Sequence, residues 1–205
     1  MPAAAPRGAS LADVRLRPLN RRADLMGMAV PSFHTADLVR ALPDDGNRYE
    51  TVHGELLVTP APRADHQYVI TELVARLHPY LKRHPVGRVL TSPADISWTA
   101  DVLVQPDLFV VDLKEAQTFD WTRMKTLLLA IEVLSPSTQR YDRFTKRRVY
   151  QEFGVSCYWV IDIDGRAAEV WTPDATFPAD ERERLVWQPE GVGEALAIPL
   201  AAILP

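Results

Sequence analysis

Three features that would assign this chain to particular classes of protein are scarce or absent. Cys157 is the single cysteine among 205 residues, so no disulfide can form within the chain, and a reducing, cytoplasmic compartment is expected. No apolar run approaches the roughly 18 residues of a membrane span, and the N-terminus lacks the apolar block of a secretory signal. We therefore expect no membrane partner.

An excess of positive charge is also lacking. Lysine and arginine number 23 against 27 aspartates and glutamates, which leaves a formal net charge of −4. This balance argues against a protein that coats nucleic acid nonspecifically through an overall basic field. Any contact with nucleic acid must be local.

The first 27 residues have few large apolar side chains to bury. They are rich in alanine, proline and arginine, and we expect a disordered leader over residues 1–27 followed by a single domain over residues 28–205. Met26 and Met28 lie just before the first regular pattern and are candidate starts of translation. An arginine-containing targeting peptide is the alternative interpretation of the leader.

The rest of the chain contains strand and helix patterns of an α/β protein. Alternating segments joined by turns predict β-hairpins over residues 49–59 and 157–172. Apolar residues at helical spacing predict a long helix over residues 69–81, which Pro79 should kink or end early, and a second helix over residues 141–153. Further strands are predicted over residues 89–96, 102–111, 126–134, 185–187 and 195–198. The almost wholly apolar segment 126–134 is expected to be a central strand, covered on both faces.

Two acids interrupt apolar strand segments. Glu132 lies within the run from Leu127 to Leu134, and Asp107 divides the segment 102–111 immediately after a proline. Burying an unpaired carboxylate costs several kcal/mol, so each acid must be protonated, paired with a cation or bound to a metal ion. Two such acids on neighbouring strands indicate one shared site.

The chemistry that fits these acids is that of a hard divalent cation. Mg²⁺ takes a few oxygen ligands and keeps several waters, so two carboxylates and a backbone carbonyl suffice, with a phosphate supplying the rest. Hydrolysis of a phosphodiester also needs a cation near the attacking water and the developing charge. Lys146 is the best candidate, because it follows Glu132 on the next helix and shares a face with Asp142 and Tyr150.

The order of these motifs resembles a known family. The motifs are Tyr49 to Leu56, the proline-rich stretch ending at His66, Gln105-Pro106-Asp107, Ile131 to Thr138, Asp142 to Lys146 with Tyr150, and Tyr158 to Asp162. Together they are similar to the Uma-type putative restriction endonucleases of the PD-(D/E)XK nuclease superfamily. The resemblance implies a restriction-endonuclease-like fold, a mixed sheet flanked by helices with β-hairpins at both ends, and a Mg²⁺- or Mn²⁺-dependent phosphodiesterase site.

Carried over by residue, the resemblance marks Asp107 and Glu132 as metal ligands and Lys146 as the catalytic lysine. It also marks Glu55, on the first hairpin, as an acid that binds a second metal ion or its water; an exposed hairpin acid is the alternative for this residue. One departure from the superfamily pattern is Leu134, which stands where the lysine of an E-x-K motif would be. The resemblance therefore implies that the lysine has moved to the helix.

Simpler interpretations remain open for several of these residues. Asp107 and Glu132 could be structural acids paired with arginine or lysine. His66 could contact substrate or metal, or be an ordinary first-turn helix residue, and Asp142 could be a helix N-terminal acid paired with Lys146. The basic run that includes Arg140, Arg143 and Arg147 could be a solvated helix face, or the local patch that contacts a phosphate backbone.

The sequence thus predicts a metal-dependent endonuclease-like hydrolase that acts on DNA and, by analogy with such domains, forms a homodimer. One alternative is a catalytically silent nuclease fold that serves as a DNA-binding or assembly module. Another is the hydrolysis of a different phosphoester, such as RNA.

Overall fold

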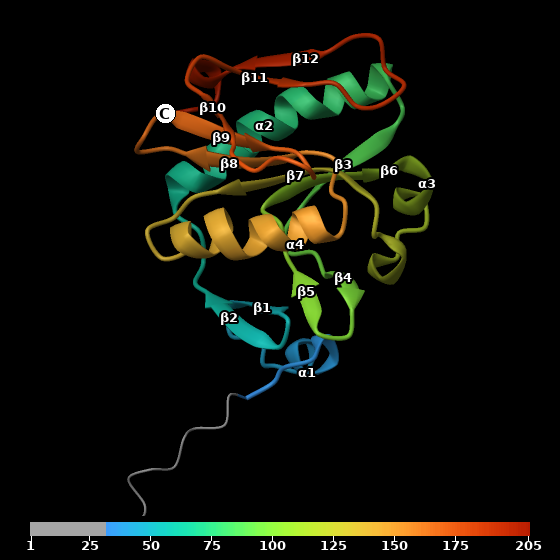
Figure 1. Ribbon diagram of the computed structural model, residues 1–205, viewed down its shortest axis with the longest axis vertical. Coiled ribbons are helices and arrows are strands. Elements are labelled where there is room, and N and C mark those ends of the chain that lie inside the picture. Colours follow the sequence, from blue (N-terminus) through green and yellow to red (C-terminus); the bar gives the residue numbers. More distant parts are fainter. Residues whose placement is uncertain (1–31) are drawn as a thin grey trace, which may run out of the picture. The chain divides into compact units, whose positions relative to one another are not determined.

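The apolar segment predicted as the central strand forms β7 (Leu127–Val133) in the middle of a six-stranded sheet (Figure 1). The structure is a computed structural model of the chain and describes residues 32–205. The strand order is β10-β9-β8-β7-β6-β3. β7 pairs antiparallel with β6 and parallel with β8, so the sheet is mixed. All but one of the residues of β7 are buried, which confirms a strand covered on both faces. The predicted leader, residues 1–27, and the candidate start sites Met26 and Met28 lie outside the described residues.

The described residues form three sheets and several helices. The large sheet contains β3 (Gly87–Thr91), β6 (Leu108–Asp112), β7, β8 (Tyr158–Asp162), β9 (Ala167–Trp171) and β10 (Ala179–Glu181). A smaller sheet, of order β2-β1-β5-β4, contains β1 (Arg48–Val52), β2 (Glu55–Thr59), β4 (Ile96–Thr99) and β5 (Val102–Val104). A hairpin joins β11 (Arg184–Trp187) to β12 (Leu196–Pro199). The helices are α1 (Ala36–Arg40), α2 (Ala64–Arg83), α3 (Leu113–Ala116) and α4 (Arg147–Glu152), with short helical turns at Trp121–Arg123, Tyr141–Lys146 and Leu200–Ala202.

Two apolar clusters cover the faces of the large sheet. On one face, α2 and the β11–β12 hairpin pack over Leu129, Ile131 and Trp159. On the other face, α4 and the smaller sheet pack over Ala130 and Val160 (Figure 1). The sheet flanked by helices and both predicted hairpins, β1–β2 and β8–β9, are confirmed. Within the described residues, no helix is both long and apolar enough to cross a membrane.

The helix α2 is longer than predicted. It begins at Ala64 and continues through Pro79 to Arg83, so the expectation that Pro79 ends it early is wrong. The apolar side chains of the last turns explain this, since Leu77, Tyr80 and Leu81 are buried against the sheet. Their burial outweighs the loss of one backbone hydrogen bond at the proline.

The predicted strand over residues 102–111 is divided between the two sheets. β5 belongs to the smaller sheet and β6 to the larger one, and Gln105-Pro106-Asp107 connects them. Pro106 has no N–H to give to a ladder, which favours an interruption at this point. The predicted strand 89–96 is divided in the same way into β3 and the start of β4, around Ser92-Pro93. Asp107 is thereby placed at the junction of the two sheets.

The predicted helix over residues 141–153 begins with a π-helical turn, Tyr141–Lys146 (η3), and continues as α4. A π-helical turn contains an extra residue compared with an α-helical one and therefore rotates the side chains that follow it. Asp142 and Lys146 are both buried in this turn. The turn thus directs a lysine into the interior, beside the large sheet.

Candidate active site

The two predicted acids lie next to each other on neighbouring strands. The antiparallel register of β6 and β7 pairs Leu108 with Ile131. Asp107 directly precedes Leu108 and Glu132 directly follows Ile131, so the same register places the two acids side by side. The backbone N–H of Val133 donates to Oδ2 of Asp107 over 2.9 Å, which fixes the aspartate at the end of β7. Asp107 is 5% exposed and Glu132 is 1% exposed. The expectation of one shared site at buried strand positions therefore agrees with their placement.

Both carboxylate oxygens of Asp107 have cationic or N–H partners. Nη1 of Arg48 donates to Oδ1 over 2.6 Å, and Nε2 of His66 lies 2.9 Å from Oδ2. Burial by itself would raise the pKa of Asp107. The hydrogen bond with His66 and the charges of Arg48 and Lys146 outweigh that effect and hold the pKa well below its usual range. Asp107 is therefore ionised.

Lys146 lies at the centre of the buried part of the site. Its Nζ is 2.9 Å from Oε1 of Glu132, 2.9 Å from Oε1 of Glu50 and 3.8 Å from Oδ1 of Asp142. The hydroxyl of Tyr150 donates to the same Oε1 of Glu132 over 2.9 Å. The structure thus brings together Lys146, Glu132, Asp142 and Tyr150, as the predicted site requires, and adds an acid that was not predicted.

That acid is Glu50, on β1, which is fully buried. Besides its ion pair with Lys146, its Oε1 accepts a hydrogen bond from the backbone N–H of Gln105 over 2.6 Å. Glu55, the acid chosen from the resemblance, is exposed at the start of β2, and its carboxylate makes no hydrogen bond or ion pair with another described residue. Glu50 therefore occupies the position in the cluster that was assigned to Glu55. The sequence signal was available, because Glu50 shares an alternating face of the hairpin with Val52.

Negative charge exceeds positive charge in this cluster. The acids Glu50, Asp107, Glu132 and Asp142 face the two permanent cations Arg48 and Lys146. Burial, opposed by Lys146 and reinforced by the neighbouring carboxylates, raises the pKa of Glu132 well above its usual value and that of Asp142 to about 6. Burial would lower the pKa of Lys146, but the charges of Glu132, Glu50 and Asp142 raise it further. Lys146 is therefore a permanent cation here.

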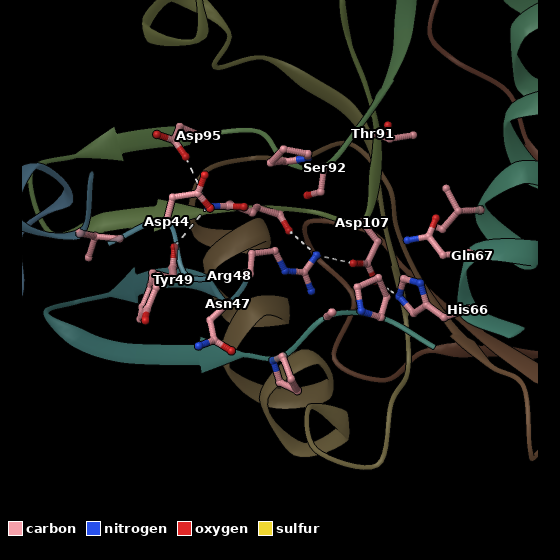
Figure 2. Close-up of a pocket in the computed structure, with 18 of the residues that line it drawn as sticks. Asp44, Asn47, Arg48, Tyr49, His66, Gln67, Thr91, Ser92, Asp95 and Asp107 are labelled. Atoms are coloured by element: carbon pink, nitrogen blue, oxygen red, sulfur yellow. Dashed lines mark hydrogen bonds and ion pairs between the residues drawn. The ribbon is translucent and has the colours of Figure 1, made fainter. Parts of the chain in front are cut away.

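A groove of about 670 Å³ lies beside Asp107 (Figure 2). Its walls come from β1, from the loop before α2 with the first turns of that helix, and from the segment between β3 and β4. Arg48, His66 and Asp107 line it, and Figure 2 shows the side chains of Arg48 and His66 converging on the aspartate from two sides. The site thus has a buried part around Lys146 and a part at Asp107 that faces the groove.

The three arginines predicted to contact nucleic acid do not line this groove. Arg143 pairs with Asp162 over 2.8 Å and with Glu169 over 2.6 Å. Arg147 stacks over the ring of Trp171 and donates to Gln151. Arg140 is exposed. Arg143 and Arg147 therefore have structural partners, and the structure places no arginine of the η3–α4 segment at the groove.

The carboxylate oxygens of the cluster are the type of ligand that a hard divalent ion prefers. Glu50, Asp107 and Glu132 offer carboxylate oxygens, and Oε2 of Glu50 is buried without a hydrogen-bond partner in the described part of the chain. Within residues 32–205, no three acidic, histidine or cysteine side chains converge as a ready-made set of ligands. Lys146 and Arg48 lie against the carboxylate oxygens instead. An ion can enter only if these cations or the carboxylates shift.

Comparisons with known proteins agree with this architecture. A crystal structure described as a putative nuclease belonging to DUF820 from Anabaena variabilis superposes with a TM-score of 0.69 at 21% identity, covering 83% of this chain and 97% of that one. At that identity the likeness establishes the fold, which is nuclease-like. No curated protein sequence matches the chain. The model of the Uma2 family, described as "Putative restriction endonuclease", matches residues 36–201. The chain therefore belongs to the Uma2 family.

Proposed function

We propose that the chain is a Mg²⁺- or Mn²⁺-dependent endonuclease that hydrolyses phosphodiester bonds in DNA. The observation that carries the proposal is the cluster of Glu50 and Glu132 around Lys146, next to Asp107, which lines a groove. Membership of the Uma2 family supports a nuclease-like function. The surplus of carboxylates over permanent cations supports a divalent ion, which would neutralise it.

The residues of the cluster have different roles in this proposal. Asp107 and Glu132 would hold the ion, and Glu50 would contribute a further carboxylate. When bound, the ion supplies Lewis-acid polarisation of the phosphate and lowers the pKa of water. Lys146 orients the attacking water and stabilises the charge that develops on the phosphate. Tyr150 and His66 orient Glu132 and Asp107 through their hydrogen bonds.

The proposal also covers the nucleic-acid substrate, the oligomeric state and the cellular location. DNA is favoured by the family description, and hydrolysis of RNA is the alternative that substrate comparison decides. A homodimer would bring two sites to the two strands of a duplex. A cytoplasmic location is supported by the single cysteine, which is buried and unpaired among the described residues.

The test is cleavage of supercoiled and linear DNA, with single-stranded RNA in parallel, in Mg²⁺ or Mn²⁺. Cleavage should be abolished by a chelator. Asp107→Asn and Glu132→Gln, which keep the shape of each side chain, should lower the rate at least about 100-fold, because outer-shell residues alone contribute 10- to 100-fold. Cleavage that persists in both variants would sink the proposed site.

A second candidate is a nuclease fold that binds DNA without cutting it. The observation that favours it is the pairing of the carboxylate oxygens with cations of the protein itself, Asp107 with Arg48 and Glu132 with Lys146. Such a site could stay closed to metal. Tight DNA binding without cleavage in either metal, unaffected by Asp107→Asn, would favour this module.

A further inference from the structure

Arg48 is the arginine that links the groove to the carboxylates. It begins β1, and its Nη1 donates to Oδ1 of Asp107 over 2.6 Å and to the carbonyl of Gln105 over 3.5 Å. Within the described part of the chain, its Nε and Nη2 make no hydrogen bond, and the side chain is 22% exposed. In Figure 2 its guanidinium lies between Asn47 and Asp107 along the groove. Nε and Nη2, two of the guanidinium nitrogens whose planar arrangement suits a phosphate, are therefore free.

The other cations near the site are less suited to a substrate phosphate. Lys146 is 1% exposed and is enclosed by carboxylates. Arg40 also lines the groove, but it pairs with Asp37 and Asp95. Arg143 and Arg147 are held by Glu169 and Trp171. Arg48 is thus the arginine of the described chain that adjoins Asp107 and keeps donors free.

The partners of Asp107 imply competition at one oxygen. Oδ2 already accepts hydrogen bonds from His66 and from the backbone N–H of Val133, so Oδ1 is the oxygen with fewer hydrogen-bond partners. Arg48 is bound to that oxygen. A divalent ion on Oδ1 would lie a few ångströms from the guanidinium, and their repulsion would be strong in a buried setting. An anionic phosphate between the two cations would relieve it.

We propose that Arg48 is the phosphate-binding residue of this groove, and that its ion pair with Asp107 competes with a divalent ion for the aspartate. The proposal rests on the proposed function and extends it. With a divalent ion bound, the Arg48 guanidinium would be free of Asp107 and would bind a phosphate of the nucleic acid in the groove. The substrate strand therefore passes along β1 and the first turns of α2, not across α4.

The experiment measures metal and DNA binding separately. Binding of Mn²⁺ alone is followed by calorimetry, and binding of a DNA duplex in Ca²⁺ is followed over a range of salt, with gels to verify that the DNA stays intact. The variants are Arg48→Met, which removes the charge, and Arg48→Lys, which keeps a cation but not the planar fork. Arg184→Met is the matched control, because Arg184 is exposed on β11, outside the groove. Thermal unfolding verifies that each variant folds.

The proposal predicts opposite changes for metal and DNA. Arg48→Met should bind Mn²⁺ about tenfold more tightly, because a competing cation is gone, and should bind DNA more weakly with a salt slope reduced by about 0.9, the value of one phosphate contact. Arg48→Lys should keep the wild-type Mn²⁺ affinity and still lose DNA affinity. Should Arg48→Met prove too unstable to assay, Arg48→Lys carries the test through the DNA arm. Arg184→Met should match the wild type in both.

A merely structural role for Arg48 would weaken both kinds of binding together. Unchanged or weaker Mn²⁺ binding by Arg48→Met, an unchanged DNA salt slope in Arg48→Met, or an unchanged DNA affinity in Arg48→Lys overturns the assignment of Arg48 while leaving the nuclease proposal in place. A wild-type chain that binds neither Mn²⁺ nor DNA overturns the nuclease proposal itself, and the role of Arg48 with it.

Discussion

Glu50 on β1 and Lys146 at the end of η3 form an ion pair of 2.9 Å in the interior of the protein. The pair connects the smaller sheet to the helical segment that covers the large sheet. Because Lys146 also contacts Glu132 on β7, one side chain joins three elements that are distant in the sequence. The candidate site is therefore part of the core that holds the two sheets together, and changes in it should affect both stability and activity.

Glu50 and Glu55 provide a direct comparison of the acid found and the acid predicted. Glu50→Gln should lower metal-dependent DNA cleavage about 10- to 100-fold, the range for groups that support metal ligands. Glu55→Gln should cleave like the wild type, since the Glu55 carboxylate is exposed and has no partner among the described residues. Rates of plasmid nicking under identical metal concentrations measure the difference. A large loss in Glu55→Gln with none in Glu50→Gln would reverse the assignment.

Lys146 should be essential for stability as well as for catalysis. Lys146→Met leaves Glu50 and Glu132 without their shared cation, and removal of one partner of a buried ion pair costs about 3–5 kcal/mol. Urea denaturation at neutral pH measures the loss of unfolding free energy. Addition of Mn²⁺ should restore more stability to Lys146→Met than to the wild type, because the ion can take over the neutralisation of the carboxylates.

A Lys146→Met variant as stable as the wild type would contradict the stabilising role given to the buried ion pairs of Lys146. The matched control is Arg148→Met, which removes a cation from an exposed position of α4 close in the sequence. Its unfolding free energy should stay within about 0.5 kcal/mol of the wild type.

The parts of the site that the sequence predicts are those that depend on local pattern. A charged residue inside an apolar strand is visible without a structure, and this is how Asp107 and Glu132 are found. The π-helical turn is not visible in that way, although it determines that Lys146 points inward while Arg143 turns toward Asp162 and Glu169. The sequence-based assignment of Arg143 and Arg147 to nucleic-acid contact did not take this rotation into account, and it stays a prediction.

Glu50 was missed because its burial depends on tertiary packing. The alternation of β1 places Glu50 on the same face as Val52, but only the packing of the smaller sheet against Val149 and Tyr150 brings that face to Lys146. The interruption at Pro106 has a similar origin: the pattern of residues 102–111 is that of one strand, and the switch between sheets arises from the pairing of β5 with β1. Long-range pairing of this kind cannot be derived from local propensity.

Tyr150 should contribute through its hydroxyl. Tyr150→Phe removes the hydrogen bond to Glu132 and leaves the ring in place, so the expected loss of unfolding free energy is about 1–3 kcal/mol, as for a bond to a charged acceptor. Tyr68→Phe, on the exposed side of α2, should be within about 0.5 kcal/mol of the wild type. Chemical denaturation compares the two, and equal stabilities would show that the hydroxyl of Tyr150 is dispensable.

Arg143 should stabilise the fold in a pH-dependent manner. Burial alone would raise the pKa of Asp162, but the hydrogen bonds from the N–H of Gly165 and from Arg143 lower it below its ordinary value of 3.8. A carboxyl group whose pKa is lower in the folded state contributes its full stability above the unfolded-state pKa, and loses it as the pH falls through the folded-state pKa. The contribution of the pair should therefore be present at neutral pH and disappear in acid.

Arg143→Met should accordingly lose about 1–2 kcal/mol of unfolding free energy at pH 7, the size expected for partly exposed charge-assisted hydrogen bonds. The difference from the wild type should shrink as the pH is lowered below about 4, where Asp162 becomes protonated in the unfolded chain and then in the folded one. Urea denaturation from pH 7 to pH 3 measures it. A stability difference that stays constant across this range would mean that Arg143 stabilises the helix by packing and not through Asp162. DNA binding by Arg143→Met at pH 7 should equal that of the wild type, because the guanidinium is already paired within the protein.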